Sequence, residues 1–221
     1  MDTPTPGSDN EKTRVLYGVK YFDSETNAII ESQLDDLYFF TTFVGAHNIT
    51  IEKGDSIFYL SKDETTAYIK CGPASITSSH IATIIRGYMP EEKSSTITKK
   101  TSLPYVNGCS TKQIFPPERP GDPTLQLLDI PPYSAEQAHH IHSTVRVVYV
   151  LSGTGRSVVG MGKNCVTEKL YRGKSIILQK MCPHHFETDG EHLIVLPLHV
   201  FSSSGALENN HPMFHGTHLT G

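Results

Sequence analysis

Several features of specialised proteins are missing from this sequence. Tryptophan is absent, and no stretch of about 18 apolar residues is present that could cross a membrane as a helix. There is also no long run of lysine and arginine, and the formal net charge is -4. We therefore expect neither a nucleic-acid partner nor a membrane partner.

Cysteine is scarce as well. The 221 residues contain four cysteines, which are widely spaced and form no C-x-x-C pair. A chain of this length can bury a core without disulfides, so we expect reduced thiols and a cytoplasmic location. The polar N-terminus lacks the apolar core of a signal peptide, and we expect a flexible leader over residues 1–14.

Helical periodicity is also rare. Short apolar runs rich in β-branched and aromatic residues alternate with turn-forming residues, a pattern typical of an all-β sandwich or barrel. The polar segment 89–100 (MPEEKSSTITKK) predicts a boundary between a β-domain over residues 15–100 and a barrel over residues 104–204. Residues 205–221 have the composition of a loop-like tail.

The run Thr144–Leu151 (TVRVVYVL) predicts a strand that is covered on both sides. If Arg146 points into the barrel, Val148 and Val150 do so too, because alternate residues share a face. The opposite face is apolar as well and needs a cover, which could be the other sheet, the N-terminal domain or a second subunit. We therefore expect a two-barrel or homodimeric arrangement.

Histidine is abundant, and 10 of the 12 histidines lie at or after His139. His140 and His142 are two residues apart, so on a strand both imidazoles point to the same side and can reach one metal ion. His184 follows a second apolar strand and supplies a third nitrogen. Three nitrogen ligands leave coordination positions open for water or substrate, as in reactive metal centres.

The remaining histidines have other predicted places. His139 and His185 should face away from the cluster by parity, and His192 and His199 are expected to be satisfied structural residues. A loose tail is expected to carry His211, His215 and His218, because proline and glycine interrupt that segment.

The spacing of these residues resembles the two motifs of the cupin superfamily. Positions of the first motif fall on Ser134, His140, His142, Arg146 and Gly153, and those of the second on Gly173, Gln179, Met181, His184 and Thr188. The ending Pro183–Glu187 (PHHFE) reproduces the usual end of the second motif. The resemblance covers about 100 residues and implies an eight-stranded jelly-roll barrel with one divalent metal ion inside.

Arg146 departs from the family pattern, which has a glutamate ligand at this position. A guanidinium stays protonated and cannot ligate a cation, so the resemblance implies a site of three neutral imidazoles. Arg146 could then clamp an anionic substrate, or it could pair with Glu136 or Glu187 and only stabilise the barrel. Four further residues are expected behind or beside the ligands: Tyr133, Glu136, Cys182 and Phe186.

The N-terminal half resembles a degenerate cupin domain that has lost its ligands. Gly54 and Asp55 precede an apolar strand like the start of a second cupin motif, but Thr65 stands where a metal histidine would fall, and the upstream segment 34–45 has no H-x-H. The alternative is a β-extension that packs on the barrel without closing into one.

Two classes of function remain open. The first is a metal-dependent oxidoreductase, a mononuclear dioxygenase with Fe(II) as the first choice and Zn, Mn, Ni or Cu as alternatives, acting on a small anionic molecule. The same architecture also serves lyases and isomerases. The second is a non-catalytic cupin that binds a metal or a small ligand as a sensor or store.

Overall fold

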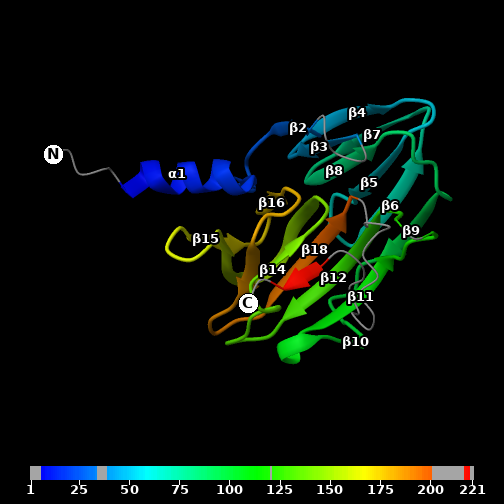
Figure 1. Ribbon diagram of the computed structural model, residues 1–221. Coiled ribbons are helices and arrows are strands. Elements are labelled where there is room, and N and C mark those ends of the chain that lie inside the picture. The colour runs from blue at the N-terminus through cyan, green and yellow to red at the C-terminus, as the bar shows by residue number, and fades with distance from the viewer. Residues whose placement is uncertain (1–5, 34–38, 120, 201–216, 220–221) are drawn as a thin grey trace.

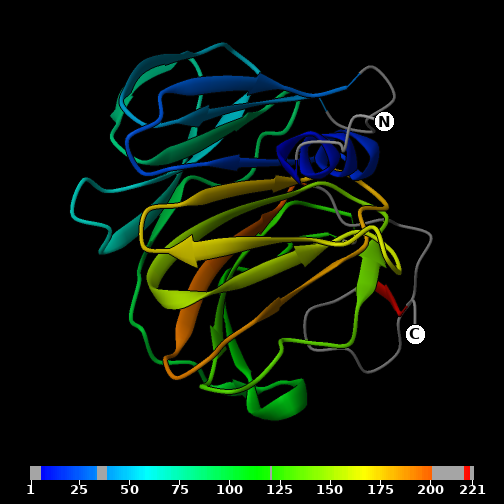
Figure 2. The same ribbon diagram turned by 90° about the vertical axis from the view of Figure 1, so that its left-hand side faces the viewer.

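The structure is a computed structural model that describes residues 6–33, 39–119, 121–200 and 217–219 (Figure 1). It confirms the all-β prediction: nineteen strands, one α-helix and one short 3-10 helix make up the described elements. The strands form two β-domains stacked on each other, with the N-terminal strands above the barrel in Figure 2.

The N-terminal domain consists of a six-stranded antiparallel sheet, in the order β2-β3-β8-β5-β6-β9, and the pair β4-β7. A small apolar core of Ile49, Ile51, Ile57, Ala82 and Ile84 joins the two sheets. Its strands are β2 (Ala28–Glu31), β3 (Phe40–Val44), β4 (His47–Ile51), β5 (Ser56–Leu60), β6 (Thr66–Cys71), β7 (Ala74–Ser78), β8 (Ile81–Ile85) and β9 (Lys93–Thr96).

Two sheets that share strand β14 form the C-terminal barrel. One sheet runs β10-β11-β12-β18-β14-β16-β1, and the other runs β15-β14-β17-β13-β19. The elements are β1 (Val19–Phe22), β10 (Leu103–Pro104), η1 (Val106–Gly108), β11 (Ser110–Phe115), β12 (Thr124–Ile130), β13 (His140–His142), β14 (Arg146–Val159), β15 (Val166–Tyr171), β16 (Ser175–Leu178), β17 (His184–Glu187), β18 (Leu193–His199) and β19 (Thr217–Leu219).

Strand β14 passes from one sheet to the other through Ser152–Gly155, which its composition marks as a turn. The register with β18 shifts between Val150 and Ser152, and Gly153 adopts a positive φ of 82°. A Cβ on Gly153 would lie 1.7 Å from the carbonyl oxygen of His192, so only glycine fits here. The glycines therefore bend a continuous strand instead of ending it.

The parity predicted for β14 is confirmed, and the N-terminal domain supplies the outer cover. Val148 and Val150 belong to the core inside the barrel. Val147 and Tyr149 belong to a second core that includes Phe58 of the N-terminal domain. Because the N-terminal domain covers the outer face, that face gives no argument for a second subunit, and the homodimer stays a prediction.

Two expectations about the domain limits differ from the structure. Residues 1–14 were expected to be a flexible leader, but Pro6–Tyr17 forms helix α1, and Arg14 binds Glu168 of β15 at 2.5 Å. Strand β1 lies inside the expected N-terminal domain (15–100), yet it pairs with β16 of the barrel. The segment 89–100 contains β9, which pairs with β6, so this segment belongs to the N-terminal sheet and lies within the expected limit of that domain at residue 100.

The end of the chain also differs from expectation. Residues 201–204, the last of the expected barrel, and residues 205–216 of the expected tail lie outside the described residues. Within the rest of that tail, Thr217–Leu219 forms strand β19, which pairs with β13. His218 therefore belongs to a sheet, whereas His211 and His215 are not among the residues described.

Candidate metal centre

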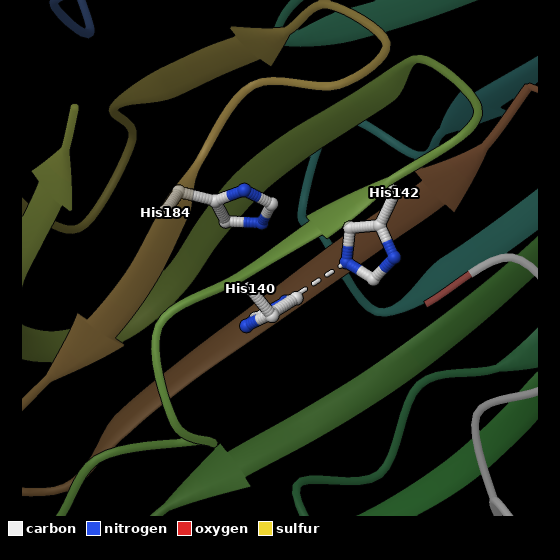
Figure 3. A group of neighbouring side chains, drawn as sticks. All are labelled: His140, His142 and His184. Atoms are coloured by element: carbon white, nitrogen blue, oxygen red, sulfur yellow. Dashed lines mark hydrogen bonds between the residues drawn. The ribbon is translucent and has the colours of Figure 1, made fainter. Parts of the chain in front are cut away.

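Three histidines converge in the barrel from two neighbouring strands, as the sequence predicts (Figure 3). His140 and His142 belong to β13, and His184 begins β17 directly opposite His140 in the register. All three side chains are buried, and their ligand nitrogens lie within 4.8 Å of one another. Among the described residues, no other group of three His, Cys, Asp or Glu side chains is placed to hold a metal ion.

Backbone carbonyls orient two of the imidazoles. Nδ1 of His140 lies 2.8 Å from the carbonyl oxygen of Ala138, and Nδ1 of His184 lies 2.8 Å from that of Cys182. Each Nδ1 therefore carries the hydrogen and donates a hydrogen bond to the carbonyl oxygen, which leaves Nε2 as the ligand atom. Both contacts come from the residue two positions upstream, so the local strand geometry aims each ring.

Burial keeps the imidazoles neutral. Burial, together with the smaller effect of the positive charge of Arg146, lowers the pKa of His140 to about 4. Burial and Arg146 also hold the pKa of His142 well below its usual value, and burial and His140 do the same for His184. Neutral imidazole is the form that binds metal, so no proton has to be released near neutral pH.

The donor set fits a divalent transition metal. Nε2 of His140 and Nε2 of His142 are 3.0 Å apart. Two nitrogens that each lie about 2.1 Å from one ion, at about a right angle, would be about 3 Å apart. Imidazole nitrogen is a common ligand of Fe, Zn, Cu and Ni, so the chemistry of the ligands agrees with the spacing.

The neighbouring histidines face away from this cluster, as parity predicts. Nδ1 of His139 and Nδ1 of His185 are 2.8 Å apart, and Nε2 of His139 lies 2.6 Å from the carbonyl oxygen of Gly160. His192 contacts Asp129 at 2.8 Å on the surface, which agrees with its predicted structural role.

Arg146 is buried beside the cluster at the start of β14. It donates hydrogen bonds to the hydroxyl of Thr144 and to the carbonyl oxygen of Val145. Glu187, one of the two partners considered for it, contacts Arg156 at 3.0 Å and His185 at 3.5 Å. Arg146 thus adds a buried positive charge to the wall that carries the three imidazoles.

Three of the four expected supporting residues are in place. Glu136 is buried, and its Oε1 accepts a hydrogen bond from the backbone N–H of Phe186. Burial raises the pKa of Glu136 to about 8, so this carboxyl is mostly neutral at pH 7. The Phe186 ring lies 6.0 Å from the ring of His184. Cys182 supports His184 through its carbonyl, while burial raises the pKa of its thiol to about 12 and makes the thiol unreactive.

The prediction for Tyr133 is wrong. Tyr133 has a positive φ of 56°, and its side chain is 84% exposed. The turn before Ser134 rotates the ring into solvent, so it does not support the ligands.

His199 is a residue of the centre that sequence reasoning placed only in the structural background. It is buried, pairs with Arg146 in the register of β18 and β14, and its ring centroid lies 6.2 Å from that of His142. Directly opposite residues share one face of a sheet, so His199 and Arg146 line the same wall. Parity along β18 could have found it, because Leu193 and Val195 belong to the core inside the barrel.

Two further observations concern thiols and membranes. All four cysteines are unpaired in the structure. Among the described helices, none is long and apolar enough to span a membrane.

Comparison with known proteins identifies one family. The family model of the cupin domain matches residues 126–201, which run from within β12 past the end of β18 and include all three histidines. No curated protein matches the chain.

Several solved structures resemble the chain at low sequence identity. A cupin 2 conserved barrel domain protein from Leptotrichia buccalis is 14% identical, with 82% of this chain and 96% of that chain covered and a TM-score of 0.48. A variant of the oxalate decarboxylase OxdC from Bacillus subtilis is 10% identical, with 81% and 76% covered and a TM-score of 0.47. The polyketide cyclase RemF from Streptomyces resistomycificus is 21% identical, with a TM-score of 0.36; 41% of this chain and 63% of that chain, less than two thirds of its length, are covered.

Because these TM-scores are below 0.5, the assignment of the family depends on the family model and on the two motifs. The motifs place the ligands at the matching positions, and the fold has the expected two-sheet barrel. Residues 126–201 of this chain are a cupin domain.

Proposed function

We propose that this protein is a mononuclear, non-haem metal dioxygenase that acts on a small anionic organic substrate. The observation that carries the proposal is the cluster of three neutral imidazoles beside the buried guanidinium of Arg146. Fe(II) is the metal that we expect in the active protein.

The charges favour an anionic substrate. His140, His142 and His184 bring no negative charge, so a bound divalent ion keeps its full positive charge. Arg146 adds a further positive charge, and Glu136 is mostly neutral near pH 7. A buried positive charge is stabilised by an anion in contact with it, and a planar guanidinium suits a carboxylate.

The protein residues would then divide the work. His140, His142 and His184 would hold the metal, which when bound would supply open coordination positions for the reactants. Arg146 would bind the substrate carboxylate and orient the molecule, with His199 on the same wall. The apolar half of the interior, which includes Val148 and Phe186, would exclude water from the reacting groups.

A non-catalytic role in binding a metal or small ligand is the second candidate. The observation that favours it is the engagement of the Arg146 guanidinium by Thr144 and by the carbonyl of Val145. In that case Arg146 would stabilise the wall of the barrel rather than bind a substrate.

Oxygen uptake separates the two candidates. Protein loaded anaerobically with Fe(II) is mixed with oxygenated buffer and a panel of small carboxylates and thiols. A dioxygenase consumes oxygen with at least one of them and places both atoms of isotopically heavy O₂ in the product. If the loaded protein binds panel members but consumes no oxygen with any of them, the binding role replaces the dioxygenase.

Arg146→Gln tests whether Arg146 binds the carboxylate of the substrate, and Arg156→Gln is the matched control on the same strand. Arg156 lies on the far end of β14 and pairs with Glu187 and Asp189 at the surface. Loss of a bidentate contact costs about 2 kcal/mol or more, so the affinity for a carboxylate should fall at least about 30-fold in the Arg146 variant. Equal affinities in the two variants would contradict the clamp.

A further inference from the structure

Strand β13 carries two of the three metal ligands but is only three residues long. On one side it meets β17 at the single pair His140 and His184, and the backbone N–H of Met181 donates to the carbonyl of His142 at 2.6 Å. On the other side β19, at the end of the chain, pairs with all three residues of β13. In the sheet order β15-β14-β17-β13-β19, the C-terminal strand therefore makes β13 an interior strand.

The backbone N–H and carbonyl groups of successive residues along β13 point to opposite sides of the strand, and one observed bond fixes which residues face which side. The carbonyl of His142 points toward the β17 side, so His140 and His142 present their backbone groups to that side. The backbone N–H and carbonyl of Ile141 then point toward β19. His218 lies opposite Ile141 in the register, and residues directly opposite each other in this position exchange two hydrogen bonds.

We propose that strand β19 is part of the metal centre: its backbone ladder to Ile141 fixes β13 so that His140 and His142 stay at ligand spacing. Without β19, the strand that carries the ligands would be a three-residue edge with the backbone groups of Ile141 turned away from the barrel. Strands this short are held by their neighbours rather than by their own propensity. The C-terminus therefore sets the metal affinity of residues almost 80 positions earlier in the chain.

This inference rests on the proposed metal binding, and it also makes a claim about the metal-free protein. The ladder protects the amide of Ile141 from hydrogen exchange whether or not an ion is bound. A failure of metal binding in the wild-type protein would overturn the proposed function. The exchange rate of the Ile141 amide would still test whether β19 holds β13 in place.

The experiment uses a proline substitution at His218 and compares it with its neighbour. His218→Pro removes the N–H that faces β13, whereas Leu219→Pro changes a residue whose N–H faces the other way. His218→Ala keeps the backbone N–H and removes the imidazole. A chain that ends at Gly216 removes the whole strand.

Two quantities are measured for each full-length variant and for the truncated chain: the affinity of the metal-free protein for Co(II), and the exchange rate of the Ile141 amide. We expect His218→Pro and the truncation to lower the affinity about 10- to 100-fold and to accelerate the exchange, as for lost support of metal ligands. His218→Ala and Leu219→Pro should stay within about 3-fold of wild type.

Two results would overturn the inference. One is unchanged affinity and exchange in both His218→Pro and the truncated chain. The other is an equal loss in His218→Ala and His218→Pro, which would assign the effect to the imidazole instead of the backbone. Exchange of the Ile57 amide in the N-terminal core serves as the folding control and should not change.

Discussion

The two β-domains share one architecture but bury different chemistry. The apolar core between the sheets of the N-terminal domain consists of aliphatic residues such as Ile49, Ile51 and Ile57, with aromatic residues packed against it. The barrel has an apolar core of its own, represented by Val148 and Val150, but it also buries three imidazoles, a guanidinium and a carboxyl.

This difference distinguishes apolar residues that pack the fold from the buried polar residues that form the candidate metal site. Burying polar groups destabilises a fold unless each group finds a partner, as Thr42 and Thr83 do for each other in the N-terminal domain. The barrel keeps three imidazoles and Arg146 at one place, where their mutual repulsion and burial lower the pKa of each histidine.

The largest expected effect is the loss of metal affinity when one ligand is removed from the barrel. His184→Ala leaves two imidazoles, so the affinity for a divalent metal should fall at least about 100-fold. His47→Ala is the matched control in the N-terminal domain, where Nε2 of His47 contacts only the carbonyl of Val44 among the hydrogen bonds described. Titration with Co(II) measures both, and equal losses in the two variants would contradict the account.

A smaller effect concerns the buried carboxyl of Glu136. The pKa of Glu136 is about 8 in the folded protein and near 4.5 in the unfolded chain. Its contribution to the free energy of unfolding is therefore fully present below about pH 4.5 and is lost as the pH rises toward 8. Glu136→Gln is neutral at every pH. The free energy of unfolding of the variant relative to wild type should therefore rise by about 2 kcal/mol between about pH 6 and about pH 8.

Urea unfolding of the metal-free proteins at the two pH values measures this difference. The buried histidines act in the opposite direction, because their lowered pKa values remove stability as the pH falls below 6.5. Their contribution is common to both proteins and cancels in the comparison. A difference that does not change with pH would show that Glu136 is ionised in the folded state.

The smallest effect concerns the contact between the domains. Tyr149 of the barrel donates a hydrogen bond to Glu64 of the N-terminal domain, and Arg172 binds the other carboxylate oxygen at 2.7 Å. Tyr149→Phe should lower the free energy of unfolding by about 1 to 2 kcal/mol, since a buried carboxylate loses one donor. The metal content should not change. Loss of metal with an unchanged stability would mean that Tyr149 serves the site instead.

Sequence reasoning found the site because the site depends on short-range geometry. Two residues of separation place His140 and His142 on one face, and alternation along β14 predicts both the inward Arg146 and the outer cover. The cover itself, the N-terminal domain, was one of three alternatives, because parity says that a face is buried and not what buries it.

The failures involve long-range contacts. Helix α1 carries a weak local signal and is tied to the barrel by Arg14 and Glu168, which are 154 residues apart in sequence. The pairing of β19 with β13 joins Thr217 to His142 across the whole barrel domain, and no local pattern of the tail indicates it. At Ser152–Gly155, composition indicates a turn, but the close approach of the His192 carbonyl explains the glycine.

The most direct test of the central claim is the metal content of the wild-type protein and of the His140→Ala, His142→Ala and His184→Ala variants. Each is prepared without oxygen, loaded with Fe(II), freed of excess ion and analysed for bound metal. The account predicts about one ion per wild-type chain and less than about a tenth of an ion in each variant. A wild-type protein without stoichiometric metal, or variants that retain it, would contradict the account.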